Sequence, residues 1–136
     1  MAEITITSPI ELSFSVIEAD DRLPSLKTEI LFIHKHPTGI VQYSASDKWF
    51  RCNEWDDFVE DLKEMVNNSG GKASLMDLDE FFVLKLSKSE QVYSFLIEIK
   101  ETDLPDRLTN LRFESRISSD EVASLIRQWT EFPKWW

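Results

Sequence analysis

Apolar and polar residues alternate along the first fifty positions, and this pattern predicts β-strands. Every second residue from Ile10 to Val16 is apolar, and the residues between them are glutamate or serine, which is the period of a strand with one buried face. A shorter alternation precedes Pro9, a longer strand starts at Leu26, and another follows the turn signal that ends at Gly39. We expect that last strand to be interrupted at Ser46–Asp47.

The pattern changes to a helical period between Asn53 and Asn68. Apolar residues recur there at spacings of three and four, so they occupy one arc of a helix, and we expect all of them to be buried. They are Trp55, Phe58, Val59, Leu62, Met65 and Val66. Asn53 is the predicted N-cap, and the Asn-Asn-Ser-Gly-Gly run from Asn67 is the predicted end. The opposite arc carries six carboxylates and only one lysine, so it is strongly anionic.

Strand patterns resume after Gly71. Three alternating stretches follow one another, with inward residues that start at Phe82, Tyr93 and Leu111. The links between them are short and polar, at about residues 87–90 and 102–106. Consecutive strands with short links form a meander, so we expect this part of the sheet to be antiparallel.

A second amphipathic helix is predicted at residues 119–131. Ser118 and Glu121 have the spacing of a capping box immediately before its apolar stripe. Together the elements predict a single α+β domain over residues 1–136. Its mainly antiparallel sheet, curved or split into two layers, carries helices at about 53–68 and 119–131.

The charge of the chain narrows the classes of partner. Its formal net charge is −10, and half of the excess lies on residues 53–68, where six acidic side chains accompany one basic side chain. Nucleic acids and anionic membranes bind clusters of lysine and arginine, so neither is an expected partner. A basic protein surface would be attracted to such a helix. The alternative is that the acidic face only keeps the protein soluble.

Length and cysteine content indicate an ordinary cytoplasmic domain. A chain of 136 residues is long enough to bury a core without disulfides or metals. Cys52 is the only cysteine, and neither a secretory signal nor an apolar stretch long enough to cross a membrane is visible. We therefore expect a cytoplasmic protein that is a monomer or a weak homodimer.

No pattern in the chain carries a recognisable catalytic or metal chemistry. His34 and His36 precede Pro37 in an expected loop, and no carboxylate or thiol at motif spacing completes a metal site with them. Cys52 starts a helix, a position that lowers some thiol pKa values, but no motif places a histidine beside it. The carboxylates from Asp77 onward lack the central glycine of a calcium loop, and three glycines are too few for a phosphate-binding loop. We predict a non-enzymatic protein without metal or cofactor, although a carboxylate pair assembled by the fold would leave no signature.

Three tryptophans have two possible roles. Trp49 stands just before the acidic helix, and Trp135 and Trp136 end the chain. Tryptophan is enriched at binding hot spots, but exposed indoles also favour aggregation, so these rings either contact a partner or fold back over the core. The predicted partner-binding set consists of these tryptophans and five carboxylates, namely Glu54, Asp57, Glu60, Asp61 and Glu64.

Taken in order, the elements of this chain resemble those of the WapI-type immunity family, which are small acidic bacterial proteins that neutralise a cognate polymorphic toxin. The resembling stretches are Ile10–Phe14, Leu26–Ile33, Glu54–Leu62, Leu75–Leu86 and Glu121–Trp129, the last followed by Phe132-Pro133. The resemblance implies a protein without catalysis. It would bind a toxin domain, often a basic nuclease, and block its active site or another surface that the toxin needs.

Two other functions stay open at this point. A chaperone or adaptor for a secreted effector shares the small size, the acidity and the α+β content, although type III secretion chaperones usually begin with a helix and this chain begins with strands. A small enzyme acting on a carbohydrate or nucleotide would need a concave pocket with convergent polar groups.

Overall fold

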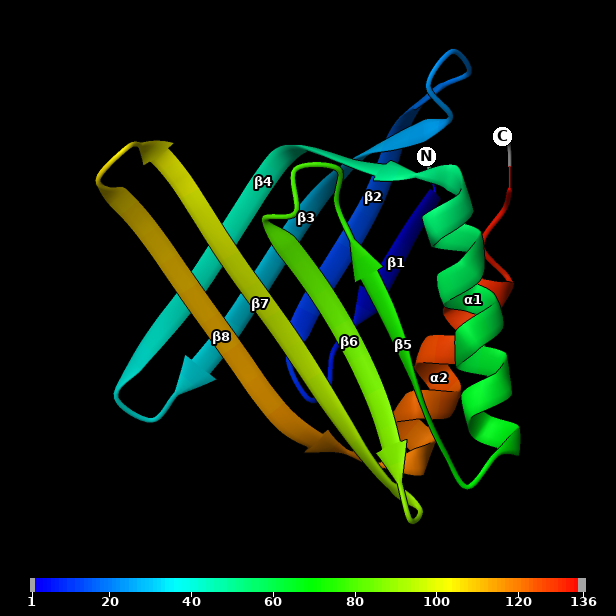
Figure 1. The fold of residues 1–136 in the computed structure, drawn as a ribbon. Helices are drawn as coiled ribbons and strands as arrows, with labels where there is room; N and C mark the ends of the chain where they lie inside the picture. The colour runs from blue at the N-terminus through cyan, green and yellow to red at the C-terminus, as the bar shows by residue number, and fades with distance from the viewer. Residues whose placement is uncertain (1, 135–136) are drawn as a thin grey trace.

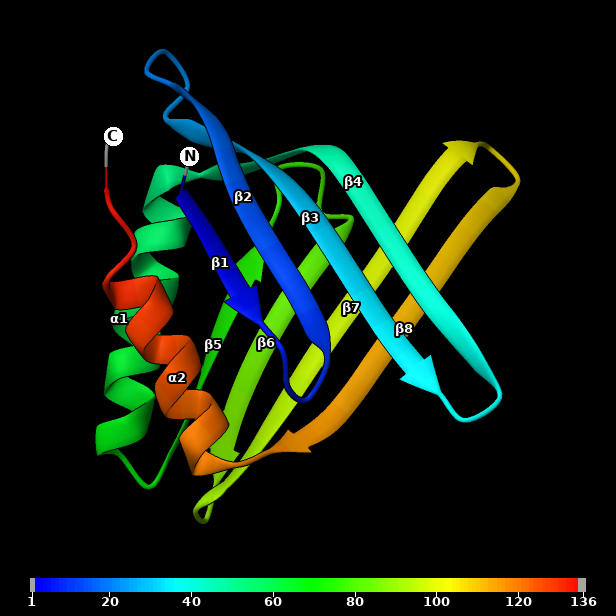
Figure 2. The same ribbon diagram turned by 180° about the vertical axis from the view of Figure 1, so that it is seen from behind.

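The computed structural model describes residues 2–134, which form two four-stranded antiparallel sheets and two helices (Figures 1 and 2). The first sheet has the strand order β1-β2-β3-β4, with β1 (Ala2–Ile6), β2 (Glu11–Asp20), β3 (Ser25–His36) and β4 (Gly39–Arg51). Helix α1 (Cys52–Asn67) follows. The second sheet has the order β5-β6-β7-β8 and precedes α2, with β5 (Gly70–Met76), β6 (Phe82–Ser89), β7 (Val92–Leu104), β8 (Arg107–Ile117) and α2 (Ser119–Thr130). The predicted α+β class, with an antiparallel sheet split into two layers, is confirmed.

The predicted alternation is realised in the strands. In β2, Leu12, Phe14 and Val16 are at most 1% exposed, whereas the residues between them face away from the interior. Strands β6 and β7 repeat this pattern from Phe82 and from Tyr93. One face of each sheet is therefore apolar and packs against the other sheet. The opposite face is more polar and faces the solvent, as is common for antiparallel sheets.

The links between the strands are tighter than the sequence pattern predicts. Strand β6 extends through most of the expected link, and Glu90 and Gln91 alone turn the chain, with φ values of 49° and 71°. Two residues with positive φ are typical of a tight hairpin whose twist matches the strands. Strand β7 likewise extends to the Pro105–Asp106 turn. The expected interruption at Ser46–Asp47 is a β-bulge, where the pairing of β4 with β3 shifts.

The cap of α1 differs from the prediction. Its N-cap is Arg51, which makes no side-chain capping hydrogen bond, and Asn53 lies inside the first turn. The prediction of Asn53 as the N-cap is therefore wrong. The N–H of Cys52 donates instead to the carbonyl of Pro24 in the β2–β3 loop, at 2.9 Å. A distant segment thus satisfies one of the groups that every helix start leaves open.

Two asparagines end α1. The side-chain amides of Asn67 and Asn68 donate to carbonyls one turn earlier, so that part of the predicted stop is confirmed. Gly70 and Gly71 are not part of the helix end, because they are already the first residues of β5. Gly71 has a φ of +146°, a conformation that residues with a side chain rarely adopt.

The second helix begins as predicted. The Ser118 hydroxyl accepts a hydrogen bond from the N–H of Glu121, and the Glu121 carboxylate accepts one from the N–H of Ser118. The carboxylate also accepts a hydrogen bond from the Ser8 hydroxyl, which ties the start of α2 to the β1–β2 loop. Neither α1 nor α2 is long and apolar enough to cross a membrane.

The chain consists of two successive units of the same kind, each a four-stranded meander followed by a helix. The helix of each unit lies beside the first strand of the other unit, since α1 runs next to β5 and α2 next to β1 (Figures 1 and 2). The N–H of Thr5 in β1 donates to the side chain of Gln128 in α2, at 2.8 Å. Helices therefore close one side of the two sheets, whereas β4 and β8 are the outer strands on the other side.

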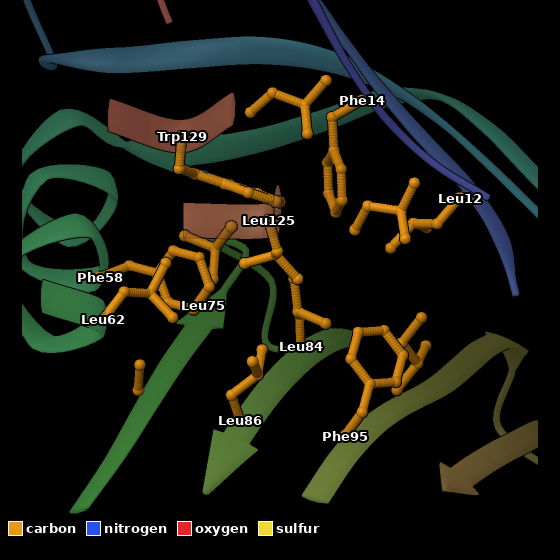
Figure 3. Close-up of a cluster of buried hydrophobic side chains, with 14 of the residues drawn as sticks. Leu12, Phe14, Phe58, Leu62, Leu75, Leu84, Leu86, Phe95, Leu125 and Trp129 are labelled. Atoms are coloured by element: carbon orange, nitrogen blue, oxygen red, sulfur yellow. The ribbon is translucent and has the colours of Figure 1, made fainter. Parts of the chain in front are cut away.

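Phe14 lies where both sheets and both helices meet. The centroid of its ring is 5.4–6.5 Å from those of four other aromatic rings, which belong to Phe50, Trp55, Phe82 and Trp129. All four contacts are edge-to-face, the geometry that aromatic pairs favour. Figure 3 shows apolar side chains from both sheets and both helices pointing into this shared interior.

One predicted core residue is not buried. Val66 is 43% exposed, because it lines a hollow between the end of α1 and the start of α2 together with Val122 and Ile126. Val59 is half-buried and lines a second hollow between the two helices, together with Trp129. Helical periodicity places a residue on the apolar arc, but it does not say how closely another helix approaches that arc.

We predict that Phe14→Ala lowers the free energy of unfolding by about 4 kcal/mol, because it leaves a cavity where five aromatic rings meet. That is a large part of the roughly 5–15 kcal/mol that stabilises an ordinary domain. Urea denaturation measures the change. The control is Leu108→Ala, at a position that is 67% exposed, where we expect less than about 0.5 kcal/mol. A similar loss in both variants would contradict the central place of Phe14.

Candidate functional site

Helix α1 divides its carboxylates between two flanks. Hollows between α1 and α2 are lined by Asp56, Glu60 and Lys63, so these side chains stand on the flank toward α2. A helix turns about 100° per residue, which places the other carboxylates on the flank away from α2. We call this second group the acidic flank, and it consists of Glu54, Asp57, Asp61 and Glu64.

The two groups of carboxylates differ in their ion pairs. Asp56 pairs with Lys134 at 2.9 Å, and Glu60 pairs with Lys63 at 3.3 Å. Within residues 2–134, no basic side chain lies within ion-pair distance of the acidic flank. Three of its four members are exposed and Glu54 is half-buried. Four of the five predicted carboxylates thus lie on the acidic flank, and the fifth, Glu60, borders it but lines the hollow toward α2 and pairs with Lys63.

The spacing of the acidic flank opposes helix stability. Its members follow one another at intervals of three, four and three residues, so each carboxylate is a neighbour of the next on the helix surface. Like charges at these spacings destabilise a helix by about 0.2–0.5 kcal/mol per pair. The helix dipole favours negative charge only in the first turn, and the last turn of α1 contains no basic residue. Helix stability therefore does not explain a row of carboxylates on one flank. Solubility does not require the row either, because the same charges scattered over the surface would also keep the protein soluble.

The acidic flank is held in place by the buried side of α1. Trp55, Phe58 and Leu62 are at most 1% exposed. The rings of Trp55 and Phe58 lie 5.9 Å and 5.2 Å, centroid to centroid, from the ring of Trp129 in α2. Because this packing fixes the helix axis and its rotation, the carboxylates are presented in one direction.

The predicted tryptophans do not extend this flank in the described residues. Trp49 is half-buried in β4 between the inward side chains of Lys48 and Phe50, so it points to the outer face of the first sheet. Its indole N–H donates to Asp47 at 3.1 Å. Trp135 and Trp136 lie outside the described residues.

The structure also places the two histidines and the cysteine that the sequence analysis considered. His34 and His36 belong to the end of β3 and not to a loop, and their ring centroids are 4.2 Å apart. No group of three or more potential metal ligands occurs within residues 2–134. Burial raises the pKa of the Cys52 thiol, and the Asp56 carboxylate raises it further. This direction is opposite to the one that would activate a nucleophile.

The sequence pattern missed a polar cluster between the two sheets, in which Lys48 and Asp77 are buried and Tyr43 and Glu101 are partly buried. The ammonium group of Lys48 in β4 lies 2.8 Å from Glu101 in β7 and 3.7 Å from Asp77 in the β5–β6 loop. The Tyr43 hydroxyl donates to Glu101 at 2.6 Å, and Asp77 accepts hydrogen bonds from the N–H groups of Phe81 and Phe82. A lysine at an inward strand position was the available signal, because its charge had to find partners.

The cluster changes the pKa values of Glu101 and Tyr43. Hydrogen bonds from Lys48 and from Tyr43 hold the pKa of the Glu101 carboxyl group below the ordinary value. Burial and the adjacent Glu101 raise the pKa of the Tyr43 hydroxyl, so it stays a donor over the whole physiological range. The cluster joins β4 to β7 and the β5–β6 loop, and its contacts are those of a cross-link between sheets.

The lowered pKa of Glu101 predicts an acid-sensitive contribution to stability. A carboxyl group with a depressed folded-state pKa stabilises the fold above its unfolded-state pKa and loses this effect as the pH falls through the folded-state value. We expect Glu101→Gln to be less stable than the native protein at pH 7, and the difference to shrink as the pH falls from about 5 toward 3. Urea denaturation across this range measures it, with Glu29→Gln at an exposed position as control. A difference that does not depend on pH would contradict the assignment.

Comparisons with known proteins add no relative to this picture. No protein-family model, no curated protein and no solved structure matches the chain. The resemblance to the WapI-type immunity family therefore stays a hypothesis drawn from the residues. The function is argued below from the geometry of the acidic flank.

Proposed function

We propose that this protein is a non-enzymatic immunity protein that neutralises a basic toxin domain by binding it through the acidic flank of α1. The observation that carries the proposal is the run of like charges at Glu54, Asp57, Asp61 and Glu64, which lacks compensating cations in residues 2–134. Such a run opposes the helix that bears it. A cationic partner would remove the repulsion, so the arrangement becomes favourable in a complex.

Electrostatic complementarity gives this binding its expected character. Opposite potentials on two proteins accelerate their encounter and discriminate against partners with the wrong charge. Exposed charges are screened over about 8 Å at physiological ionic strength, so the association should weaken with added salt. A neutraliser of a toxin benefits from rapid capture, which is the property that this surface supplies.

The resemblance stated above supports the same proposal. Its stretch Glu54–Leu62 is the part of α1 that contains three members of the acidic flank. The family resemblance implies inhibition by direct binding without catalysis. The expected partner is then a basic toxin domain, and either its active site or another essential surface is covered.

We expect the combined Asp57→Lys, Asp61→Lys and Glu64→Lys variant to lose at least about 100-fold in affinity for the toxin domain at physiological salt, because attraction becomes repulsion. The matched control reverses Glu18, Glu29 and Glu131, which are exposed and have no ion pair in the described residues, so its net charge changes equally. Isothermal titration calorimetry at two salt concentrations measures affinity, and circular dichroism checks the fold.

The test needs the partner, and the coding sequence adjacent to this one is the first candidate. Its product is expressed in a bacterial host alone and together with this protein. Toxicity that coexpression relieves supports the proposal, and the flank variant should fail to relieve it while the control succeeds. Secretion of a harmless product would indicate a chaperone instead. Rescue by the flank variant at native strength would refute the role of α1.

A further inference from the structure

The two sheets leave two strand edges uncovered. Helices lie beside β1 and β5, but within residues 2–134 β4 pairs only with β3 and β8 pairs only with β7. An uncovered edge offers unpaired N–H and C=O groups to another strand, and proteins usually protect such edges with charged side chains. Strand β8 has this protection, because it carries Arg107, Arg112, Glu114 and Arg116.

Strand β4 lacks that protection over more than half of its length. The segment Gly39–Ala45 reads Gly-Ile-Val-Gln-Tyr-Ser-Ala and contains no charged residue, in a chain of which 29% is charged. We call it the neutral edge. Its ends are defined by the hairpin turn before Gly39 and by the bulge at Ser46–Asp47. Ile40 is 66% exposed and Val41 is 37% exposed, so the segment also presents apolar surface.

We propose that the neutral edge pairs with the neutral edge of a second copy of this chain, antiparallel and about a two-fold axis. Two copies with a net charge of −10 repel each other wherever their charged surfaces meet. The neutral edge avoids this repulsion, because identical uncharged strands bring no like charges together. A basic partner would gain no electrostatic attraction there. The inference is independent of the proposed function, which uses a different element.

The side-chain alternation of β4 defines the register of this pairing. Tyr43 points inward, where its hydroxyl reaches Glu101 in β7, and Gln42 therefore points outward. Residues opposite each other in a continuous antiparallel sheet share a face. The two-fold axis must therefore lie midway between the two copies of one residue, so that this residue is opposite itself. The residue at the middle of Gly39–Ala45 is Gln42. Pairing centred there uses the whole neutral edge.

This register places specific side chains together. Gln42 lies opposite Gln42 of the other copy, and their amides can exchange hydrogen bonds. Val41 lies opposite Tyr43, an aliphatic–aromatic pair of the kind that stabilises neighbouring strands. Ile40 lies opposite Ser44, which reduces the exposure of the most exposed apolar residue of β4. The β1-β2-β3-β4 sheet of one copy and the same sheet of the other copy then form one continuous eight-stranded sheet.

Single cysteines test the register. In a Cys52→Ala background, Gln42→Cys places two thiols at the axis, where opposite Cα atoms are about 4.5–5.5 Å apart and within disulfide reach. Ser44→Cys is the matched control on the same face, because its two copies are four positions out of register, about 13 Å apart. Under mild oxidation we expect Gln42→Cys to form a covalent dimer and Ser44→Cys to stay monomeric. Equal cross-linking of both variants, or none in either, would overturn the proposed pairing.

Sedimentation equilibrium of the cysteine-free Cys52→Ala protein and of Gln42→Lys in that background tests the dimer without any cross-link. Two lysines at the axis would face each other, so we expect the dimer dissociation constant to rise at least about 100-fold. Leu108→Lys on β8 is the control for an added charge at the other uncovered edge, and we expect no change. If the Cys52→Ala protein is monomeric up to millimolar concentration, the inference is refuted. Loss of the dimer in Leu108→Lys instead would show that β8 is the interface.

Discussion

The joint burial of aromatic side chains from both sheets and both helices is the constraint on which the rest of this structure depends. Phe14 contributes from the first sheet, Phe82 from the second, and Trp55 and Trp129 from the two helices. A four-stranded meander with one apolar face has to cover that face to be stable. Each unit of this chain covers the face of the other, and its helix also covers the first strand of the other. Neither unit is complete alone.

This packing explains how α1 can carry charges that oppose its own stability. Burial of a large apolar side chain contributes about 1.5–3 kcal/mol, whereas each like-charge pair on the acidic flank costs about 0.2–0.5 kcal/mol. The rings of Trp55 and Phe58 therefore decide that the helix forms, and the carboxylates are free to serve another purpose. The same packing prevents the helix from rotating, so its charges keep one direction.

The fold is also asymmetric between its two sides. On one side, helices cover the first strand of each sheet and the interior is filled with aromatic rings (Figures 1 and 3). Toward the other side the inward residues Tyr43 and Phe113 are only half-buried, and the cluster of Lys48 with Asp77 and Glu101 links the layers by charge and hydrogen bonds. The side with the helices presents the acidic flank of α1, and the opposite side presents the uncovered edges of β4 and β8.

The sequence by itself determined the elements, because alternation and helical period depend only on neighbours along the chain. It located the strands, the capping box of Ser118 and the anionic arc of α1. It could not determine how Arg51 and Cys52 start α1, why Val66 stays exposed, or that Lys48 meets Glu101. These depend on segments far apart in the chain. Only the tertiary structure decided which carboxylates meet a lysine and which strand edges a helix covers, because both outcomes follow from packing between the two units.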